Sequence, residues 1–353
     1  MHVLLNDEET MLADSVFGQA VELGATGTEA LQHHDDRRLW QGLATSDVLS
    51  LGLSEDFGGF GTLTDAAIAA MALGRALAPV PYLGCAILPT QLLASTGGSL
   101  GLVDDLLSGA RRVAVGIDPN TNELASESSA RAIAWDCAGA DAALVLDGDG
   151  SGRLVAVGLE SLGQDLDLTR QSRRCALETR SLVVGLEDQT KGLTGSALTR
   201  WNALALAMVS ADMAGVMDGA LALAIEHVKT RHQFGVPIGT FQALQHLLAE
   251  QHVSLEGARA TTLYAAWALD KRPEDAVSAA HTAKAYCSEH GKRLCEAVLQ
   301  VHGGMGVTWE CLAHVFLKRV LFDRAVLGDE RHHLRAIAAM QRASGRKGDA
   351  GGL

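Results

Sequence analysis

The segment RHQFGVPIGTFQALQHLLAEQ, residues 231–251, constrains the fold more than any other part of the chain. A charged and aromatic cluster, Arg231 to Phe234, precedes a Gly-Val-Pro turn, and an apolar helical pattern resumes after Thr240, whose hydroxyl can cap it. The pattern predicts two helices joined by a hairpin turn. Arg231 and Gln233 at such a turn can offer a guanidinium and an amide to one anionic ligand, which suits a pyrophosphate. They can equally lie solvated at a helix C-terminus, where the helix dipole favours a positive charge.

Two more motifs stand on either side of this segment. GLSEDFGGFG occupies residues 52–61, where glycines permit a tight loop, and QVHGGMGVTWE occupies residues 300–310. The three motifs, in this order, resemble the signatures of the acyl-CoA dehydrogenase family of flavoproteins, and the resemblance covers nearly the whole chain. It implies an acyl-CoA dehydrogenase-like fold and FAD as the cofactor.

The resemblance also implies which residues hold the cofactor. In the family, an arginine, a QFG and a following FQ hold the FAD of a neighbouring subunit. A pair of glycines allows the backbone to approach a phosphate or ribose closely. We therefore expect the adenine and pyrophosphate end of FAD at a subunit interface. The expected cofactor-binding residues are Arg231, Gln233, Phe234, Phe241, Gln242, Gln300, Gly303 and Gly304.

Composition narrows the class of protein. A chain of 353 residues with 48% hydrophobic residues and 20% charged residues is typical of a globular protein with a sizeable core. A net charge of −13 argues against nucleic acid or an anionic membrane surface as a main partner. Six scattered cysteines predict free thiols in a reducing cytosol and no metal site. The acidic N-terminus and the lack of a long uncharged apolar run predict a cytoplasmic protein without a membrane span.

The hydrophobic pattern predicts a mainly α protein with a central β domain. Residues 1–108 read as an N-terminal helical domain, with caps at Asn6 or Asp7 and at Thr64 or Asp65. Residues 109–190 contain the short apolar runs RVAVGI, ARAIAW, AALVLDG, RLVAVGL and SLVVGL, which predict a β-sandwich or barrel. Residues 191–353 predict a four-helix bundle, with one helix ending at Gly303-Gly304.

α,β-Dehydrogenation of an acyl-CoA needs a carboxylate that removes the α-proton, together with a flavin that accepts the β-hydride. The resemblance implies a glutamate in one of two places. The first place aligns with Gly328, and Asp329 and Glu330 follow it directly. These two carboxylates are the candidate bases of this chain, although they can equally pair with neighbouring cations or cap a helix.

The second place falls within residues 203–206, where the sequence is Ala-Leu-Ala-Leu and holds no carboxylate. Asp212 and Asp218 follow on the same predicted helix and suggest a structural role. The flavin-ring motifs of many family members, a Thr-Glu-Pro-Gly-Ala-Gly-Ser loop and a Trp-Ile-Thr strand, have no clear match here. The family residues that this chain lacks are thus the ones expected around the substrate and the flavin ring.

This uneven pattern resembles the shorter subunit of heteromeric α2β2 acyl-CoA dehydrogenases, including those of sterol side-chain degradation. The resemblance implies FAD-dependent dehydrogenation of an acyl-CoA thioester, with an electron-transfer flavoprotein as the electron acceptor and a homo-oligomer or heterotetramer as the assembly. Two alternatives stay open: a catalytically inactive scaffold subunit, and a flavin oxidase or hydroxylase on the same fold.

Overall fold

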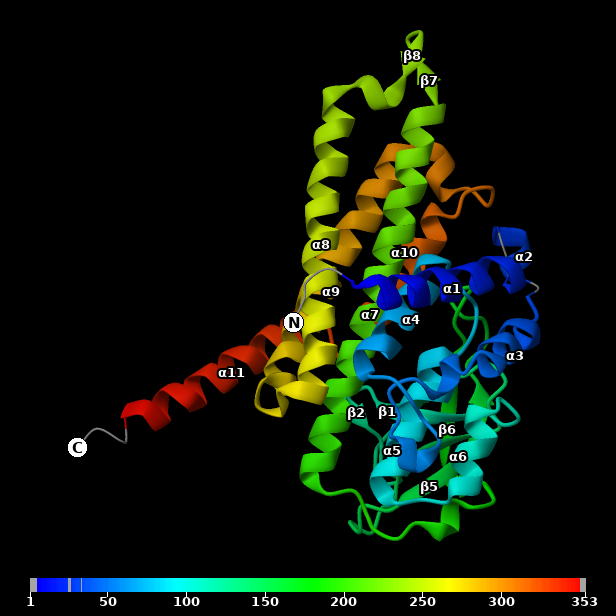
Figure 1. Ribbon diagram of the computed structural model, residues 1–353, viewed down its shortest axis with the longest axis vertical. Coiled ribbons are helices and arrows are strands. Elements are labelled where there is room, and N and C mark those ends of the chain that lie inside the picture. Colours follow the sequence, from blue (N-terminus) through cyan, green and yellow to red (C-terminus); the bar gives the residue numbers. More distant parts are fainter. Residues whose placement is uncertain (1–4, 25–26, 33, 350–353) are drawn as a thin grey trace.

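The computed structural model of the chain describes residues 5–24, 27–32 and 34–349. The long helices α7, α8 and α9 stand side by side with the shorter α10, and a small sheet and the N-terminal helices lie along one side of them (Figure 1). A hairpin marks one tip of the molecule, and the last helix projects away from the bundle (Figure 1). This is the mainly α architecture with a central β region that the sequence predicts.

The N-terminal part is helical. Helix α1 begins with a capping box, in which Asn6 accepts the Glu9 N–H at 2.9 Å and Glu9 accepts the Asn6 N–H at 2.8 Å. The predicted cap at Thr64 or Asp65 is wrong, because Thr62 has the extended backbone and accepts the Asp65 N–H. The helices here are α1 (Asp7–Leu23), α2 (Thr28–Gln32), α3 (Arg37–Thr45), α4 (Leu63–Arg75), α5 (Leu88–Thr96) and α6 (Leu100–Leu107).

The central sheet closes into a small barrel. Its strand order is β2-β1-β3-β6-β5-β4, and a parallel pairing of β1 with β4 closes the ring. Every residue of β1 is buried, which fits a strand packed on both faces. The strands are β1 (Val113–Asp118), β2 (Glu123–Leu124), β3 (Ile133–Ala134), β4 (Ala142–Leu146), β5 (Leu154–Ser161) and β6 (Arg173–Arg180).

The run SLVVGL, residues 181–186, is not a strand, so that part of the strand prediction is wrong. Leu182 and Val184 are exposed and only Val183 between them is buried. Gly185 then adopts a φ of 89° and turns the chain into a short 3-10 helix. Val183 and Leu186 of this run face the core, but no strand pairs with its backbone among the described residues.

The C-terminal helices form the long bundle. The bundle contains α7 (Gly195–Thr230), α8 (Gln242–Lys271), α9 (Pro273–His302) and the shorter α10 (Ala313–Ala325), and α11 (Glu330–Asp349) projects away from it (Figure 1). Gly215 of α7 meets the Met71 carbonyl of α4 so closely that a Cβ would lie 2.0 Å from the carbonyl oxygen. Helix α7 is long and apolar enough to cross a membrane by length and composition, but 78% of its most apolar window is buried within the protein. That burial is expected of a core helix.

A buried network of ion pairs joins the barrel to the bundle. Arg170, which follows the barrel's β5, binds Asp136 at 2.7 Å and Asp212 of α7 at 2.9 Å. Arg319 of α10 binds the other oxygen of Asp212 at 2.8 Å and the Ala78 carbonyl at 2.9 Å. The two guanidiniums and Asp212 are almost completely buried. These contacts agree with the structural role expected for Asp212.

The charge state of this network follows from its neighbours. Burial alone would raise the pKa of Asp212, but Arg319 and Arg170 lower it well below its usual range. Asp323 of α10 lies beside it, and burial together with the Asp212 charge raises the pKa of Asp323 far above its usual range. Asp212 is thus ionised at neutral pH, and the same surroundings disfavour a second negative charge on Asp323.

We expect Asp212→Asn to destabilise the protein by about 3–5 kcal/mol, because it leaves two buried guanidiniums without their shared carboxylate. Urea unfolding followed by circular dichroism measures this loss. Asp218→Asn, six residues along α7, is the control: Asp218 pairs with Arg75 and Arg259 at a partly exposed position, where a loss below about 1 kcal/mol is expected. Equal losses in the two variants would contradict this account.

Candidate functional site

The hairpin between α7 and α8 places the expected nucleotide-binding residues at one tip of the molecule (Figure 1). Strands β7 (His232–Gln233) and β8 (Val236–Pro237) pair around a two-residue turn, Phe234-Gly235, in which both residues have positive φ. Such a turn matches the twist of a hairpin but is unfavourable for a bulky residue such as Phe. The predicted helix–hairpin–helix is confirmed.

The predicted cap at Thr240 is wrong. The Thr240 hydroxyl donates to the Pro237 carbonyl at 2.7 Å within a 3-10 turn, and Phe241 holds the N-cap position of α8. The short 3-10 turn thus carries the chain from the hairpin into α8, and it leaves Phe241 and Gln242 exposed at the start of that helix.

The side chains of the hairpin are exposed. Phe234 is 90% exposed and meets only the edge of Phe241, at 6.2 Å between ring centroids. Hydrogen bonds to His227 and Ile238 fix the backbone of Arg231, but no ion pair to its guanidinium occurs among the described residues. A strained, exposed Phe beside an unpaired Arg is an arrangement that a bound partner or ligand would complete.

The second motif lies beside the base of this hairpin. The rings of His227 and His302 stack at 4.3 Å between centroids, so the end of α7 contacts the end of α9. Arg231 follows His227 by one helical turn, and Gly303 follows His302 directly. Burial, then His302 and Arg231, lower the pKa of His227, so the charged form of that ring is disfavoured beside the Arg231 cation. The two motifs that sequence reasoning joined by resemblance therefore meet in space.

The glycines at the end of α9 leave open surface. Gly303 has a φ of 60° and ends the helix as predicted. A Cβ built on Gly303 or Gly304 would meet nothing within 4 Å, so packing inside the protomer does not require these glycines. Gln300 is exposed one turn earlier. The open backbone is accessible to a phosphate or ribose, which is the fit expected for a nucleotide tail.

A crevice of about 340 Å³ separates the barrel from α10. Its walls are mostly apolar, and Phe322 and Leu327 face Ile117 and Trp135 across it. Two polar atoms of its lining residues, Trp135 Nε1 and Ser172 Oγ, are buried without a hydrogen-bond partner among the described residues. Apolar walls with a few unpaired polar atoms fit a planar ligand that can accept their hydrogen bonds. These residues fit a flavin ring.

Trp135 is a candidate that sequence reasoning missed. It follows β3 directly and is completely buried at the wall of the crevice. The run ARAIAW gave the strand, but no sequence pattern showed that its last residue faces a cavity. The available sequence signal for this site was a tryptophan at the end of a predicted strand, followed by the turn residues Asp-Cys-Ala-Gly.

A smaller chamber of about 180 Å³ adjoins this crevice, because Asn122 and Leu327 line both hollows. Ala203 and Leu206 of α7 line one wall, so the second expected position of the base is here. Leu327, directly before Gly328, lines another wall, so the first expected position adjoins it too. Both stretches of sequence that the resemblance singles out therefore border one chamber. Neither residues 203–206 nor Gly328 supplies the expected glutamate.

The candidate bases Asp329 and Glu330 are held by local contacts. Both Glu330 oxygens accept hydrogen bonds from Arg324, at 2.7 and 2.5 Å. Asp329 accepts the His332 N–H at 3.0 Å at the start of α11. These contacts lower the pKa of both carboxylates, through Arg324 for Glu330 and through the His332 backbone for Asp329. Neither side chain lines the crevice or the chamber. A catalytic role for them stays a prediction.

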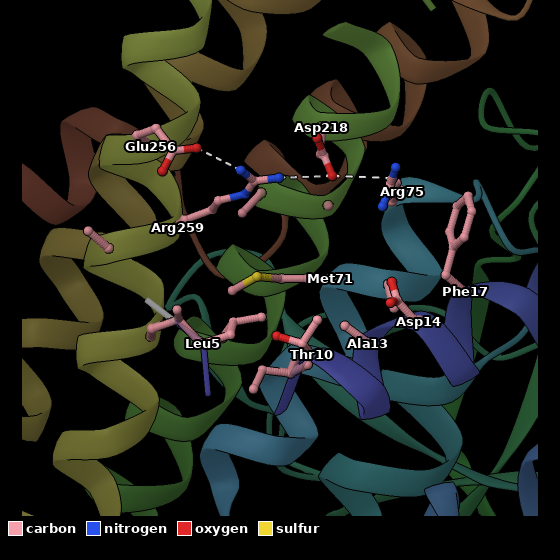
Figure 2. A pocket seen from close by; sticks show the side chains of 16 residues that line it. Leu5, Thr10, Ala13, Asp14, Phe17, Met71, Arg75, Asp218, Glu256 and Arg259 are labelled. Atoms are coloured by element: carbon pink, nitrogen blue, oxygen red, sulfur yellow. Dashed lines mark hydrogen bonds and ion pairs between the residues drawn. The ribbon is translucent and has the colours of Figure 1, made fainter. Parts of the chain in front are cut away.

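A third hollow lies away from the expected sites. It measures about 310 Å³ between α1, α4, α7 and α8. Figure 2 shows Asp218 between the guanidiniums of Arg75 and Arg259, with Glu256 on the far side of Arg259. The cations are thus already paired with carboxylates, so this hollow offers no free positive charge to an anionic ligand.

Comparison with known proteins places the chain in a family. Residues 202–341 match the acyl-CoA dehydrogenase C-terminal domain. Acyl-CoA dehydrogenase FadE27 of Mycobacterium tuberculosis is 30% identical over 336 residues, which cover 88% of this chain and 89% of FadE27. The chain therefore belongs to the acyl-CoA dehydrogenase family. It is an oxidoreductase of the type that acts on the CH–CH bond of acyl-CoA thioesters, with FAD as cofactor.

Two further relatives span almost the whole chain. Acyl-CoA dehydrogenase IpdE2 of M. tuberculosis is 29% identical over 340 residues, covering 94% of this chain and 96% of IpdE2. A chain in the crystal structure of the ChsE4-ChsE5 complex from M. tuberculosis is 26% identical with a TM-score of 0.81, covering 97% of this chain and 99% of that chain. The similarity thus includes all parts of the fold.

We expect the stability of the protein to depend on pH through His333, which lines the chamber. Burial, then the Lys284 charge, lower the pKa of His333 to about 3. An unfolded histidine titrates near 6.5, so between about pH 6.5 and 3 only the unfolded state takes up this proton, and the free energy of unfolding falls as the pH falls. Between pH 7 and 4.5, the wild type should lose about 2 kcal/mol more than His333→Asn.

Urea unfolding at a series of pH values measures this difference. The exposed His252 of α8 supplies the matched control, because His252→Asn should keep the pH dependence of the wild type. If His333→Asn and the wild type lose stability in parallel as the pH falls, His333 does not titrate as described.

Proposed function

We propose that this chain is one subunit of a heteromeric acyl-CoA dehydrogenase and completes the FAD site of a related partner subunit. The observation that carries the proposal is the exposed hairpin. The side chains of Arg231 and Gln233 have no hydrogen-bond or ion-pair partner among the described residues, and Phe234 meets only the edge of Phe241. The His227–His302 stack brings the end of α9, and with it Gly303, to the base of the hairpin. A group that bound FAD only within one protomer would not need an exposed Phe at its outermost turn.

The cofactor residues divide between two places. Arg231, Gln233, Phe234, Phe241 and Gln242, with Gln300, Gly303 and Gly304, would hold the adenine and pyrophosphate end. The crevice with Trp135 and Ser172 would hold a flavin ring. Bound FAD supplies the two-electron acceptor for the hydride that leaves the β-carbon of the thioester.

Two observations favour a related chain as the partner over a second copy. The chamber has no glutamate at either expected position, so a partner that carries a carboxylate would supply the usual base. The ChsE4-ChsE5 complex, a neighbour in fold and sequence, contains two different chains. An electron-transfer flavoprotein would reoxidise the assembly, and a cytoplasmic location belongs to the same proposal.

Surface chemistry agrees with an interface at this tip. Beyond Gly304, the chain exposes Met305, Val307 and Trp309. Phe234 and Phe241 of the hairpin are exposed as well, so each of the two motifs presents large apolar side chains that a partner would cover. A subunit that covered this surface would also enclose Arg231 and strengthen its contact with a phosphate.

We expect Arg231→Ala to weaken FAD binding roughly 10- to 100-fold while leaving the unfolding free energy within about 0.5 kcal/mol of the wild type. A charge-assisted contact to phosphate is worth about 1.5–3 kcal/mol, and this guanidinium supports nothing else in the protomer. Flavin released from the purified assembly, counted per chain, measures the effect. Lys229→Ala, two residues earlier and also exposed, should retain FAD. Full FAD content in Arg231→Ala would refute the nucleotide-tail site.

We expect the chain to co-purify from its source with a second, related flavoprotein chain. Mass spectrometry of the intact assembly, followed by identification of each chain, measures the composition. The chain expressed alone should bind little FAD. If it binds one FAD per protomer and turns over an acyl-CoA, the heteromeric proposal fails.

Product analysis then separates the alternatives. A dehydrogenase gives an enoyl-CoA with a dye acceptor, an oxidase gives hydrogen peroxide, and a scaffold subunit gives neither.

A further inference from the structure

Helix α11 presents a basic stripe that faces away from the protomer. Arg331, Arg335 and Arg342 are exposed, and at 3.6 residues per turn they lie within roughly 40° of one another around the helix axis. The opposite side of the helix packs against α9, where the buried His333 meets His281. No hydrogen bond or ion pair to the three guanidiniums occurs among the described residues. The stripe is therefore a helix face without a partner in the described protomer.

The charge of the whole chain indicates what such a stripe would bind. The sequence has 29 Lys and Arg residues against 42 Asp and Glu residues. A local positive stripe attracts an acidic surface and repels other basic ones, so it selects its partner by charge. A second copy of this acidic chain brings a surface of the required sign.

Helix α1 has the complementary face. Its sequence contains no lysine, arginine or histidine. Asp7, Asp14 and Glu22 are exposed on one side of it, opposite the buried Val16 and Ala20. No ion pair to these three carboxylates occurs among the described residues. The outward side of α1 is thus an acidic stripe without a partner in the described protomer.

The two stripes match in spacing as well as in sign. Arg335 and Arg342 are seven residues apart, and so are Asp7 and Asp14. Seven residues make two helical turns, so each pair spans about 10 Å along its helix. When the two helices lie side by side, both arginines can therefore meet both aspartates at once, whichever way the helices run.

The side chains between the charges also fit one another. Met11 lies between the two aspartates and is 72% exposed. Ala338 and Ala339 lie between the two arginines, and such small side chains leave a gap that a long side chain of a facing helix can fill. Leu334, which is 57% exposed, adds apolar surface at the edge of the basic stripe.

We propose that α11 of one copy of this chain lies along α1 of a second copy, with Arg335 and Arg342 paired to Asp7 and Asp14. Figure 1 shows α11 leading away from the bundle while α1 lies across it, so the pairing joins two protomers. The contact is reciprocal, because each copy binds the other's α1 with its own α11, and the pair closes on a two-fold axis. Exposed ion pairs are individually weak, so the charges select and orient the partner while the apolar contacts add affinity.

This contact goes beyond the proposed function. The hairpin would face a related subunit, whereas α11 joins the copies of this chain, two of which a heterotetramer contains. The contact does not depend on the identity of the other subunit.

The first test counts the copies of this chain in each particle of the co-purified assembly by native mass spectrometry. The wild type should contain two copies, and Arg335→Glu/Arg342→Glu should contain one, because its glutamates would face the aspartates of α1. Sedimentation at low salt, where surface charges are little screened, should show the association of copies weakened at least about 10-fold. Arg38→Glu/Arg131→Glu makes the same charge change at exposed positions elsewhere and should keep two copies.

A mixing experiment separates direct pairing from damage to the fold. Asp7→Arg/Asp14→Arg alone should also give particles with one copy. An equimolar mixture with Arg335→Glu/Arg342→Glu should restore two-copy particles that hold one copy of each variant. In such a pair, glutamates of one α11 face arginines of the other α1, and the second contact is unchanged from the wild type. A variant that had failed to fold would not recover on mixing.

Three results overturn the proposal: one copy per particle in the wild type, unchanged association in Arg335→Glu/Arg342→Glu, or no two-copy particles in the mixture. FAD content should stay at the wild-type level in these variants, because the hairpin lies at the tip of the molecule, away from both stripes (Figure 1). Loss of two-copy particles with full FAD content supports the α11 contact. Failure of that contact leaves the nucleotide-tail site to its own test with Arg231→Ala.

Discussion

The ion pairs around Asp212 are the interaction on which the arrangement of the molecule depends. One carboxylate from α7 binds a guanidinium from the barrel and another from α10, at a place with almost no contact with water. Charges buried so completely are tolerated only when their partners are in place, so the network fixes the relative positions of all three parts. The crevice between the barrel and α10 lies between two of the parts that this junction holds together.

Helix α7 connects the buried ion pairs to both candidate sites. Its 36 residues span roughly 50 Å. Asn202 and Ala203 near its start line the chamber, Asp212 near its middle anchors the ion pairs, and Arg231 follows its last turn. A rigid buried helix thus sets the distance between the place where a nucleotide tail would bind and the chamber. A shift of the helix at Asp212 would move both ends together.

Much of this could be predicted from the sequence because the signals are local. Periodicity gave the long helices, the Gly-Val-Pro turn signal gave the hairpin, and short apolar runs gave four of the barrel strands. The errors are also local in origin: Thr240 and Thr64 have the right chemistry for caps, but the backbone became extended one or two residues away. SLVVGL has the right alternation for a strand, but no neighbouring strand was free to pair with it.

The chamber could not be predicted, because its residues are distant in the sequence. His281 and His333 are 52 residues apart and each, taken alone, reads as one polar residue on a helix. Trp135 follows β3 and Phe322 lies on α10, and only the packing of the barrel against α10 brings both to one crevice. Such a site forms only when residues from distant parts of the chain come together in space. The spacing of residues along one helix cannot predict this.

The position aligned with the missing glutamate shows why the chamber differs. Gly328 has a φ of 100°, and a Cβ there would lie 2.8 Å from the His332 ring. A side chain at this position would strain the backbone and displace His332, and through it the turn that carries the acceptor of His333. The Gly328 carbonyl is also the atom that Lys284 and His333 both bind. In this chain Gly328, Lys284 and His333 therefore form a single hydrogen-bonded unit, and a side chain at residue 328 would disturb all three.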